Sequence, residues 1–151
     1  MNRYGDLVRA DLHDLVAERL KVTGQRYTAA RRELVDRLRT TGQPVTLPDL
    51  LSGSSLAQSS AYRNLALLEQ AGAVHRIVTS ADHARYELAE DLTEHHHHHL
   101  ICTSCGQVED FTVSPTLERS LHDAVGEVHD VTGFTAEHHR LDLIGTCRSC
   151  A

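Results

Sequence analysis

The sequence has no tryptophan, and aromatic residues make up only 4% of its 151 positions. Any hydrophobic core must therefore be aliphatic, and the 40% of hydrophobic residues is enough for one ordinary domain or two small ones. No apolar run reaches the roughly 18 residues of a membrane-spanning helix. The N-terminal residues carry acids where a signal peptide needs an apolar core. We therefore expect a cytoplasmic protein without a membrane partner.

Positive charge is scarce in the second half of the chain. Residues 1–78 carry 11 Lys and Arg against 8 Asp and Glu, a net charge of +3, whereas residues 79–151 carry 4 against 13, a net charge of −9. The basic half can face phosphates and the acidic half can hold cations. All four Cys and most of the twelve His residues lie in the acidic half, so metal binding is expected there.

Periodicity in the first half predicts four helices, because apolar residues recur there at helical spacing. These helices cover residues 6–21, 25–40, 47–51 and 58–70. For the second helix we expect Thr23 as the N-cap and Ala29 on the inner face. Its arginines are expected mostly on the solvent side. They are Arg31, Arg32, Arg37 and Arg39.

The period then changes to two, which predicts strands at 74–79 and 85–89 joined by a turn at 80–83. Helices followed by such a hairpin are typical of a winged helix-turn-helix, a DNA-binding architecture. Beyond the polar residues 90–94 we predict strands at 100–102, 108–111 and 141–145 and a helix at 116–128. The predicted fold is α+β, with a winged-helix domain at 1–89, a hinge at 90–94 and a small α/β domain at 95–151.

Two Cys-x-x-Cys pairs mark the second half. Cys102 and Cys105 form one pair, Cys147 and Cys150 form the other, and 41 residues separate them. Two such pairs can surround Zn²⁺ with four thiolates at about 2.3 Å. In a reducing cytosol this pattern is more typical of a metal site than of disulfides. We predict a closed structural zinc site, with a disulfide pair, a redox dithiol and an iron–sulfur cluster as alternatives.

Five consecutive histidines precede the first cysteine pair. In an extended strand His96 and His98 share one face and His97 and His99 share the other, so one run can supply two metal sites. The alternative is a solvated polar stretch. Imidazole with carboxylate suits Zn²⁺, Fe²⁺ or Mn²⁺. Candidates for completing the two sites are His75, Glu87, Asp110, Glu118 and His139.

Ordered motifs from about Leu20 to Cys150 resemble the ferric uptake regulator superfamily. The matching segments are LKVTGQR at 20–26, SAYRNL at 60–65, EQAGAV at 69–74, YEL at 86–88, VxDF at 108–111 and HxLxLIGxCxxC at 139–150, together with the histidine run and its following cysteine pair. The resemblance implies a homodimeric repressor without enzymatic activity or a small-molecule substrate. A metal at the hinge would set two winged helices at the spacing of a palindromic double-stranded DNA operator.

The resemblance also assigns the metal ligands. It places the structural zinc on Cys102, Cys105, Cys147 and Cys150. It places the hinge regulatory site on Glu87, His97, His99 and Asp110. It places a further site of the dimerisation domain on His96, His98, Glu118 and His139.

The sequence departs from the family at the regulatory site, because Pro44 stands where many members carry a ligand His. Zinc-uptake regulators of the family use a ligand in the first strand of the wing, where this chain has His75. A set drawn from His75, Glu87, His97 and His99 would suit four-coordinate zinc, and zinc is the favoured second metal. Zinc regulators often carry Cys at the position of Ala89, and the lack of a thiol there is evidence against zinc. Asp110 and the segment FxxxHHRL at 134–141 resemble the peroxide-sensing branch, which uses iron or manganese.

The fourth predicted helix begins with polar residues at the position where helix-turn-helix proteins enter the major groove. A tyrosine ring can contact a thymine methyl group and an arginine can bind a phosphate or a base edge. The alternative for Tyr62 is a place in the core. The predicted DNA contacts are Lys21, Arg26, Ser59, Ser60, Tyr62 and Arg63.

Two other classes of protein compete with a regulator. A zinc hydrolase would need an open coordination position and a general base, and no His-Glu-x-x-His helix is present. A zinc storage protein or chaperone would not need the helix-turn-helix half. We therefore expect a metal-responsive repressor.

Overall fold

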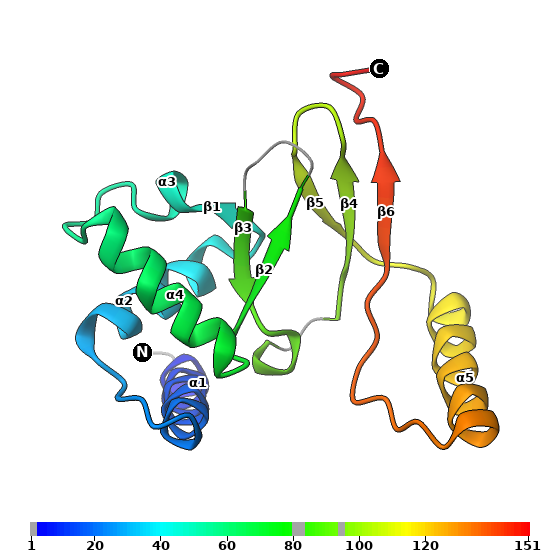
Figure 1. Cartoon of the computed structure of the whole chain (residues 1–151), viewed down its shortest axis with the longest axis horizontal. Coiled ribbons are helices and arrows are strands. Elements are labelled where there is room, and N and C mark those ends of the chain that lie inside the picture. Colours follow the sequence, from blue (N-terminus) through cyan, green and yellow to red (C-terminus); the bar gives the residue numbers. More distant parts are fainter. Residues whose placement is uncertain (1–2, 80–83, 94–95) are drawn as a thin grey trace. The chain divides into compact units, whose positions relative to one another are not determined.

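The computed structural model describes residues 3–79, 84–93 and 96–151, and the side chains of its first helix from Leu12 onward. The chain forms two compact units, Met1–His95 and His96–Ala151, which are described separately (Figure 1). The predicted turn at 80–83 and the end of the predicted hinge at Glu94 lie outside the described residues. No described helix is long and apolar enough to cross a bilayer.

Unit 1 contains the four predicted helices and the predicted hairpin. The helices are α1 (Arg3–Val22), α2 (Ala29–Thr41), α3 (Leu47–Leu50) and α4 (Gln58–Gln70). The hairpin strands β2 (Val74–Val78) and β3 (Ala84–Leu88) pair antiparallel, and a two-residue strand that was not predicted, β1 (Val45–Thr46), joins the other edge of β3. A single 3-10 turn, η1 (Glu90–Leu92), follows the hairpin.

The start of α2 corrects the predicted cap. The helix begins at Ala29 because Thr28 is its N-cap, with the Thr28 hydroxyl accepting a hydrogen bond from the backbone N–H of Arg31. Thr23 instead closes α1 by donating to the Leu20 carbonyl at 2.9 Å. Gly24, at φ 73°, takes the chain out of that helix. Ala29 is exposed, so its predicted inward position was also wrong.

The prediction that the arginines of α2 face outward is wrong for Arg31, which is only 8% exposed. Its guanidinium donates to Asn64 Oδ1 of α4 at 2.9 Å, to Gln25 Oε1 at 3.3 Å and to the Arg26 carbonyl. These acceptors remove most of the penalty of burying the cation. Arg32 is exposed and stacks over the Tyr27 ring at 4.8 Å.

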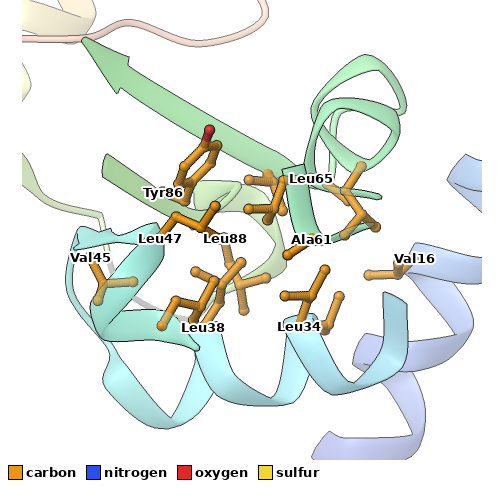
Figure 2. Close-up of a cluster of buried hydrophobic side chains, with 14 of the residues drawn as sticks. Val16, Leu34, Leu38, Val45, Leu47, Ala61, Leu65, Tyr86 and Leu88 are labelled. Carbon is orange, nitrogen blue, oxygen red and sulfur yellow. The ribbon is translucent and has the colours of Figure 1, made fainter. Parts of the chain in front are cut away.

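One almost entirely aliphatic core holds unit 1 together (Figure 2). Val16 of α1, Leu34 of α2 and Leu65 of α4 are fully buried in it, and Leu88 of β3 closes it from the sheet. Burying each such side chain contributes about 1.5–3 kcal/mol before conformational entropy is counted. The core therefore fixes α4 against both α2 and the hairpin.

Unit 2 is a three-stranded sheet with one helix. Its strands β4 (His98–Cys102), β5 (Val108–Phe111) and β6 (Asp142–Gly145) lie in the order β5-β4-β6, antiparallel between β5 and β4 and parallel between β4 and β6. The helix α5 (Pro115–Thr132) begins at the cap residue Ser114 and runs past the predicted end to Gly133, which has φ 73°. Strand β4 begins two residues before its predicted start, so the end of the histidine run is extended.

Candidate metal centres and nucleic-acid interface

The four cysteines come together at one end of the unit 2 sheet. Their sulfur atoms all lie within 4.8 Å of one another, and Cys105 Sγ is 3.9 Å from Cys147 Sγ. That separation is nearly twice a disulfide bond length and close to the roughly 3.8 Å edge of a tetrahedron with Zn–S bonds of about 2.3 Å. The predicted residues therefore have the geometry of a closed four-thiolate metal site.

The backbone of the two turns favours thiolate at this cluster. Cys147 N–H donates to Cys102 Sγ at 3.3 Å, and together with a hydrogen bond from the backbone of Cys105 it lowers the pKa of the Cys102 thiol to about 6. Hydrogen bonds with Cys147 and Cys105 raise the pKa of Cys150 to about 12. Four thiolates this close would repel one another strongly unless a cation lay between them. A bound Zn²⁺ would supply that positive charge.

A second cluster gathers three imidazoles around Glu118. The Nε2 atoms of His96, His98 and His139 lie 2.8, 3.0 and 3.1 Å from its carboxylate oxygens. His96 Nε2 and His139 Nε2 are 3.2 Å apart. These four predicted residues form a donor set that fits a divalent ion of the zinc, iron or manganese type.

The position of Glu118 follows from the local sequence. Ser114 caps α5 and Pro115 occupies its first turn, so Glu118 lies near the helix N-terminus, where a negative charge is favourable. A hydrogen bond from His98 lowers the pKa of Glu118 below its usual value. His98 is 1% exposed and packs 5.7 Å from the Phe111 ring. This second centre therefore has one rigid imidazole and a carboxylate that stays ionised.

The opposite face of the same run carries a third cluster. His97 Nε2 and His99 Nε2 each lie 3.8 Å from a carboxylate oxygen of Asp110. His99 and Asp110 are direct neighbours in the antiparallel pairing of β4 with β5, which explains why they meet. Donors around one tetrahedral ion lie about 3.4 Å apart, so the spacing fits a shared cation better than hydrogen bonds between the side chains.

Sequence reasoning missed Asp142, which contacts His99. Its Oδ1 lies 3.1 Å from His99 Nδ1, and the two residues are partners in the parallel pairing of β4 with β6. Burial favours a higher pKa for Asp142, but hydrogen bonds from Arg140 and His99 lower its pKa overall. The available signal was an acidic residue at the start of an otherwise apolar predicted strand.

Unit 1 places the two remaining candidate ligands side by side. His75 of β2 and Glu87 of β3 are direct antiparallel partners, so both side chains project from the same face of the hairpin. Glu87 is buried and His75 is half-buried. The hairpin therefore offers an imidazole and a carboxylate together.

The predicted DNA-contacting residues lie mainly on the surface of unit 1. Tyr62 is 48% exposed, which rules out the alternative that it fills the core. Ser60 is half-buried beside the Asn64 amide, which donates to the Ser60 carbonyl. The other exposed members of the set are Lys21, Arg26, Ser59 and Arg63.

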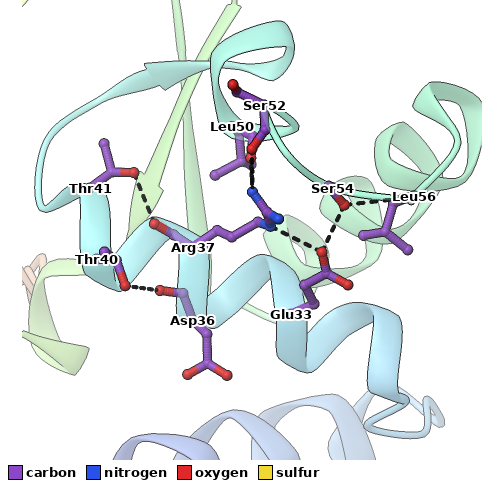
Figure 3. Close-up of polar contacts among 9 residues, drawn as sticks. All are labelled: Glu33, Asp36, Arg37, Thr40, Thr41, Leu50, Ser52, Ser54 and Leu56. Atoms are coloured by element: carbon purple, nitrogen blue, oxygen red, sulfur yellow. Dashed lines mark hydrogen bonds and ion pairs between the residues drawn. The ribbon is translucent and has the colours of Figure 1, made fainter.

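A polar network on α2 holds the loop that leads into α4 (Figure 3). Arg37 donates to the carbonyls of Leu50 and Ser52 at 3.1 and 2.8 Å and pairs with Glu33 at 3.0 Å. The Ser54 hydroxyl donates to Glu33 at 2.7 Å. The predicted exposed role of Arg37 is thus wrong, because this half-buried side chain satisfies carbonyls after α3 and fixes the turn before α4.

Comparisons with known proteins agree with these features. The model of the "Ferric uptake regulator family" matches residues 22–144. The chain belongs to this family. It is 30% identical over 139 residues to the peroxide operon regulator of Bacillus subtilis, covering 89% of this chain and 90% of that protein. It is 31% identical over 137 residues to the ferric uptake regulation protein of Neisseria meningitidis, covering 87% and 90%.

A solved structure shares the fold. The Vibrio cholerae ferric uptake regulator superposes with a TM-score of 0.62 at 27% identity, over 85% of this chain and 96% of that one. Proteins of the ferric uptake regulator family are metal-responsive transcriptional regulators that bind DNA as dimeric repressors. The matched residues include both histidine clusters but end before the second cysteine pair. The predicted α+β fold and family are therefore confirmed.

Proposed function

We propose that the chain is a repressor whose affinity for DNA is raised by a metal ion bound between its two domains. The observation that carries this proposal is the alternation of the histidine run, which brings His97 and His99 to Asp110 on one face of the unit 2 sheet. The hairpin of unit 1 presents His75 and Glu87 as a second ligand pair. We propose that one ion takes ligands from both groups, with residues 90–94 as the hinge between domains 1–89 and 95–151.

Such an ion shifts a conformational equilibrium. Coordination from both domains is complete only in the arrangement that accepts the operator, so the ion adds binding free energy to that state alone. A 100-fold preference for that state corresponds to about 2.7 kcal/mol, well within the energy of a few metal–ligand bonds. The operator affinity then follows the metal concentration.

We propose separate roles for the other two clusters. The four cysteines hold a structural Zn²⁺ that ties the end of the chain to strand β4. The site of His96, His98, Glu118 and His139 holds a further divalent ion within the dimerisation domain. The exposed apolar residues Leu143 and Ile144 of β6 and Phe134 after α5 support burial against a second copy of the chain.

Zinc is the favoured regulatory metal. His75 and Glu87 project from one face of the hairpin. Together with His97 and His99 they would offer zinc three imidazoles and one carboxylate, which is the ligand number and type of a four-coordinate zinc site. The alternative is an iron- or manganese-loaded sensor of peroxide or iron, in which Asp110 replaces His75. The 30% identity to a peroxide operon regulator favours that alternative.

The DNA surface is proposed to centre on α4. Tyr62 and Arg63 in its first turns would meet the bases and phosphates of one half-site. Lys21 in the last turn of α1 and Arg26 in the connection before α2 would bind phosphates, while Ser59 and Ser60 would contact the DNA at the start of α4. A dimer carries two such surfaces and would require a palindromic operator.

The double variant His97→Ala/His99→Ala tests the proposal. Operator duplexes are first selected from a random library with the zinc-loaded wild type, and affinities are then measured by fluorescence anisotropy with Zn²⁺, Fe²⁺ or Mn²⁺. We expect the operator affinity of the variant in the presence of metal to be at least tenfold lower than that of the wild type. The variant should keep its cysteine-bound zinc, because only the regulatory ligands have changed.

His122→Ala is the matched control, since His122 is exposed on α5 and lies outside the three clusters. It should respond to metal like the wild type. Equal operator affinity of the double variant and the wild type at saturating metal would contradict the hinge mechanism. Recovery of no preferred duplex, with metal still bound, would instead favour a zinc storage protein or chaperone.

A further inference from the structure

Asp142 contacts His99, one of the proposed regulatory ligands. It is the partner of His99 in the parallel pairing of β4 with β6, and its Oδ1 lies 3.1 Å from His99 Nδ1. The side chains of His99 and Asp142 are 7% and 22% exposed. This contact uses the ring nitrogen that points away from Asp110, because His99 Nε2 is the atom that faces Asp110 at 3.8 Å.

Asp142 is itself held in place by Arg140. The Arg140 Nε donates to Asp142 Oδ1 at 3.1 Å, and its Nη2 lies 2.9 Å from Oδ2. A guanidinium that contacts both oxygens fixes the plane of a carboxylate as well as its position. His99, Asp142 and Arg140 therefore form a chain in which each member orients the next.

We propose that Asp142 is a positioning residue for the regulatory metal. It accepts the Nδ1–H of His99, so that the ring presents its Nε2 lone pair toward the ion, and its negative charge strengthens His99 as a donor. Carboxylates behind metal-ligating histidines act in this way, and their loss typically lowers metal affinity by 10- to 100-fold. The inference rests on the proposed function of the His97 and His99 cluster and adds a residue that coordinates nothing itself.

The second centre provides an internal contrast. His98 Nδ1 is buried, and within the part of the chain that the structure describes no group accepts a hydrogen bond from it. His98 is instead oriented by its packing against Phe111 and by its Nε2 contact with Glu118. A change at Asp142 should therefore weaken metal binding at the His99 cluster without weakening the Glu118 cluster.

The test compares Asp142→Asn, Asp142→Ala and Asp142→Glu in the full-length chain. Zn²⁺ affinities are measured by competition with a chromophoric chelator on protein that already holds its cysteine-bound zinc. The His97→Ala/His99→Ala variant identifies which of the measured affinities belongs to the regulatory cluster. We expect Asn and Ala to weaken that affinity by 10- to 100-fold, and Glu to restore part of it.

Glu109→Gln is the matched control, because it removes the same charge from an exposed position of β5, the strand on the other side of β4. It should leave all zinc affinities within twofold of the wild type. Retained cysteine-bound zinc and an unchanged affinity of the Glu118 cluster show that a variant is folded. An Asp142→Asn and an Asp142→Ala protein that both bind regulatory zinc like the wild type would overturn the inference.

The two proposals fail in different ways. If the wild type and His97→Ala/His99→Ala bind the same number of zinc ions with the same affinities, the proposed regulatory site itself fails. If that double variant loses a site while the Asp142 variants keep it at full affinity, only the role of Asp142 is refuted. Uniform weakening of all sites in Asp142→Asn would also refute it, because a general structural defect does not select one centre.

Discussion

The four consecutive histidines from His96 to His99 lie in two different clusters. His96 and His98 turn toward Glu118, whereas His97 and His99 turn toward Asp110. The alternation of an extended chain is sufficient to produce this separation. Two centres can therefore have different ligands, burial and supporting groups although their imidazoles come from one sequence run.

At the same scale, we predict that the cysteines and their proposed zinc carry a large share of the stability of unit 2. The buried hydrophobic residues of its described part are Ile101, Cys102 and Val108, which is a small core for a unit of this length. We predict that Cys102→Ser loses the structural zinc and unfolds unit 2, because metal binding and folding are coupled in such sites. Zinc content and limited proteolysis provide the measurement.

The control for this prediction is Ser104→Ala, a change at an exposed residue of the same turn. It should keep one cysteine-bound zinc and the wild-type digestion pattern. Unit 1 has its own core and should resist proteolysis in both variants. Protection of unit 2 in zinc-free Cys102→Ser would show that the metal is not needed for its fold.

Among the structural elements, α4 depends on contacts that α2 makes with the chain before it. Arg37 binds two carbonyls at the end of α3, and Glu33 receives the Ser54 hydroxyl in the loop that enters α4 (Figure 3). Arg31 adds a buried link to Asn64 within α4. The proposed DNA-reading helix is thus oriented by polar contacts as well as by the core.

This network predicts a pH dependence. Hydrogen bonds from Ser54 and then Arg37 lower the pKa of Glu33 below its reference value of 4.5. A lowered carboxyl pKa stabilises the folded state above the unfolded pKa, and that stabilisation is lost as the pH falls through the folded pKa. Glu33→Gln should therefore lower the free energy of unfolding at neutral pH and have no effect well below pH ~4.

The expected size is under about 1 kcal/mol, since the Glu33 side chain is 36% exposed and solvent screens the pair. Thermal unfolding of the wild type and the variant at several pH values gives the difference. Glu18→Gln, at an exposed position of α1, is the control and should show little dependence on pH. A difference that persists unchanged in acid would refute the assignment to the Glu33 carboxylate.

The local sequence patterns predicted where helices and strands lie. They were less successful in predicting the caps of these elements and the contacts between them. The helical and alternating periods predicted α4 and β5 with their observed bounds and β2 to within one residue, since glycine and the cysteine turn delimit these segments sharply. The start of α2 was misplaced because Thr23 and Thr28 are equally good caps in sequence, and only Gly24 at positive φ decides between them. The two-residue strand β1 is too short to show a period.

In the candidate sites, too, residues in local motifs were predicted, whereas residues that meet only through packing were not. The cysteine pairs and the histidine run are dense local motifs, and their spacing was enough to group the cysteines and to divide the histidines between two faces. The resemblance to the family supplied the other members of the two sets, Glu87, Asp110, Glu118 and His139. Asp142 and the buried Arg31 depend on which strand or helix packs alongside, and no local pattern encodes that. Sequence therefore predicted the candidate metal ligands, whereas the contact of Asp142 with His99 required the sheet register.

At the scale of the whole molecule, we predict a thermodynamic link between metal binding and DNA binding. An ion that raises the operator affinity by some factor must itself bind more tightly, by the same factor, when the operator is present. Family members are dimeric repressors, so two ions would act on one palindromic duplex. We predict that neither unit alone would show this coupling between metal affinity and operator affinity.

The most direct test is the operator affinity of the wild-type protein with only its cysteine-bound zinc, measured by fluorescence anisotropy before and after the regulatory metal is added. We predict that the operator affinity rises roughly 10- to 100-fold, with a matching rise in metal affinity when the operator duplex is present. An operator affinity that stays the same before and after the addition of Zn²⁺, Fe²⁺ and Mn²⁺ in turn would contradict this prediction.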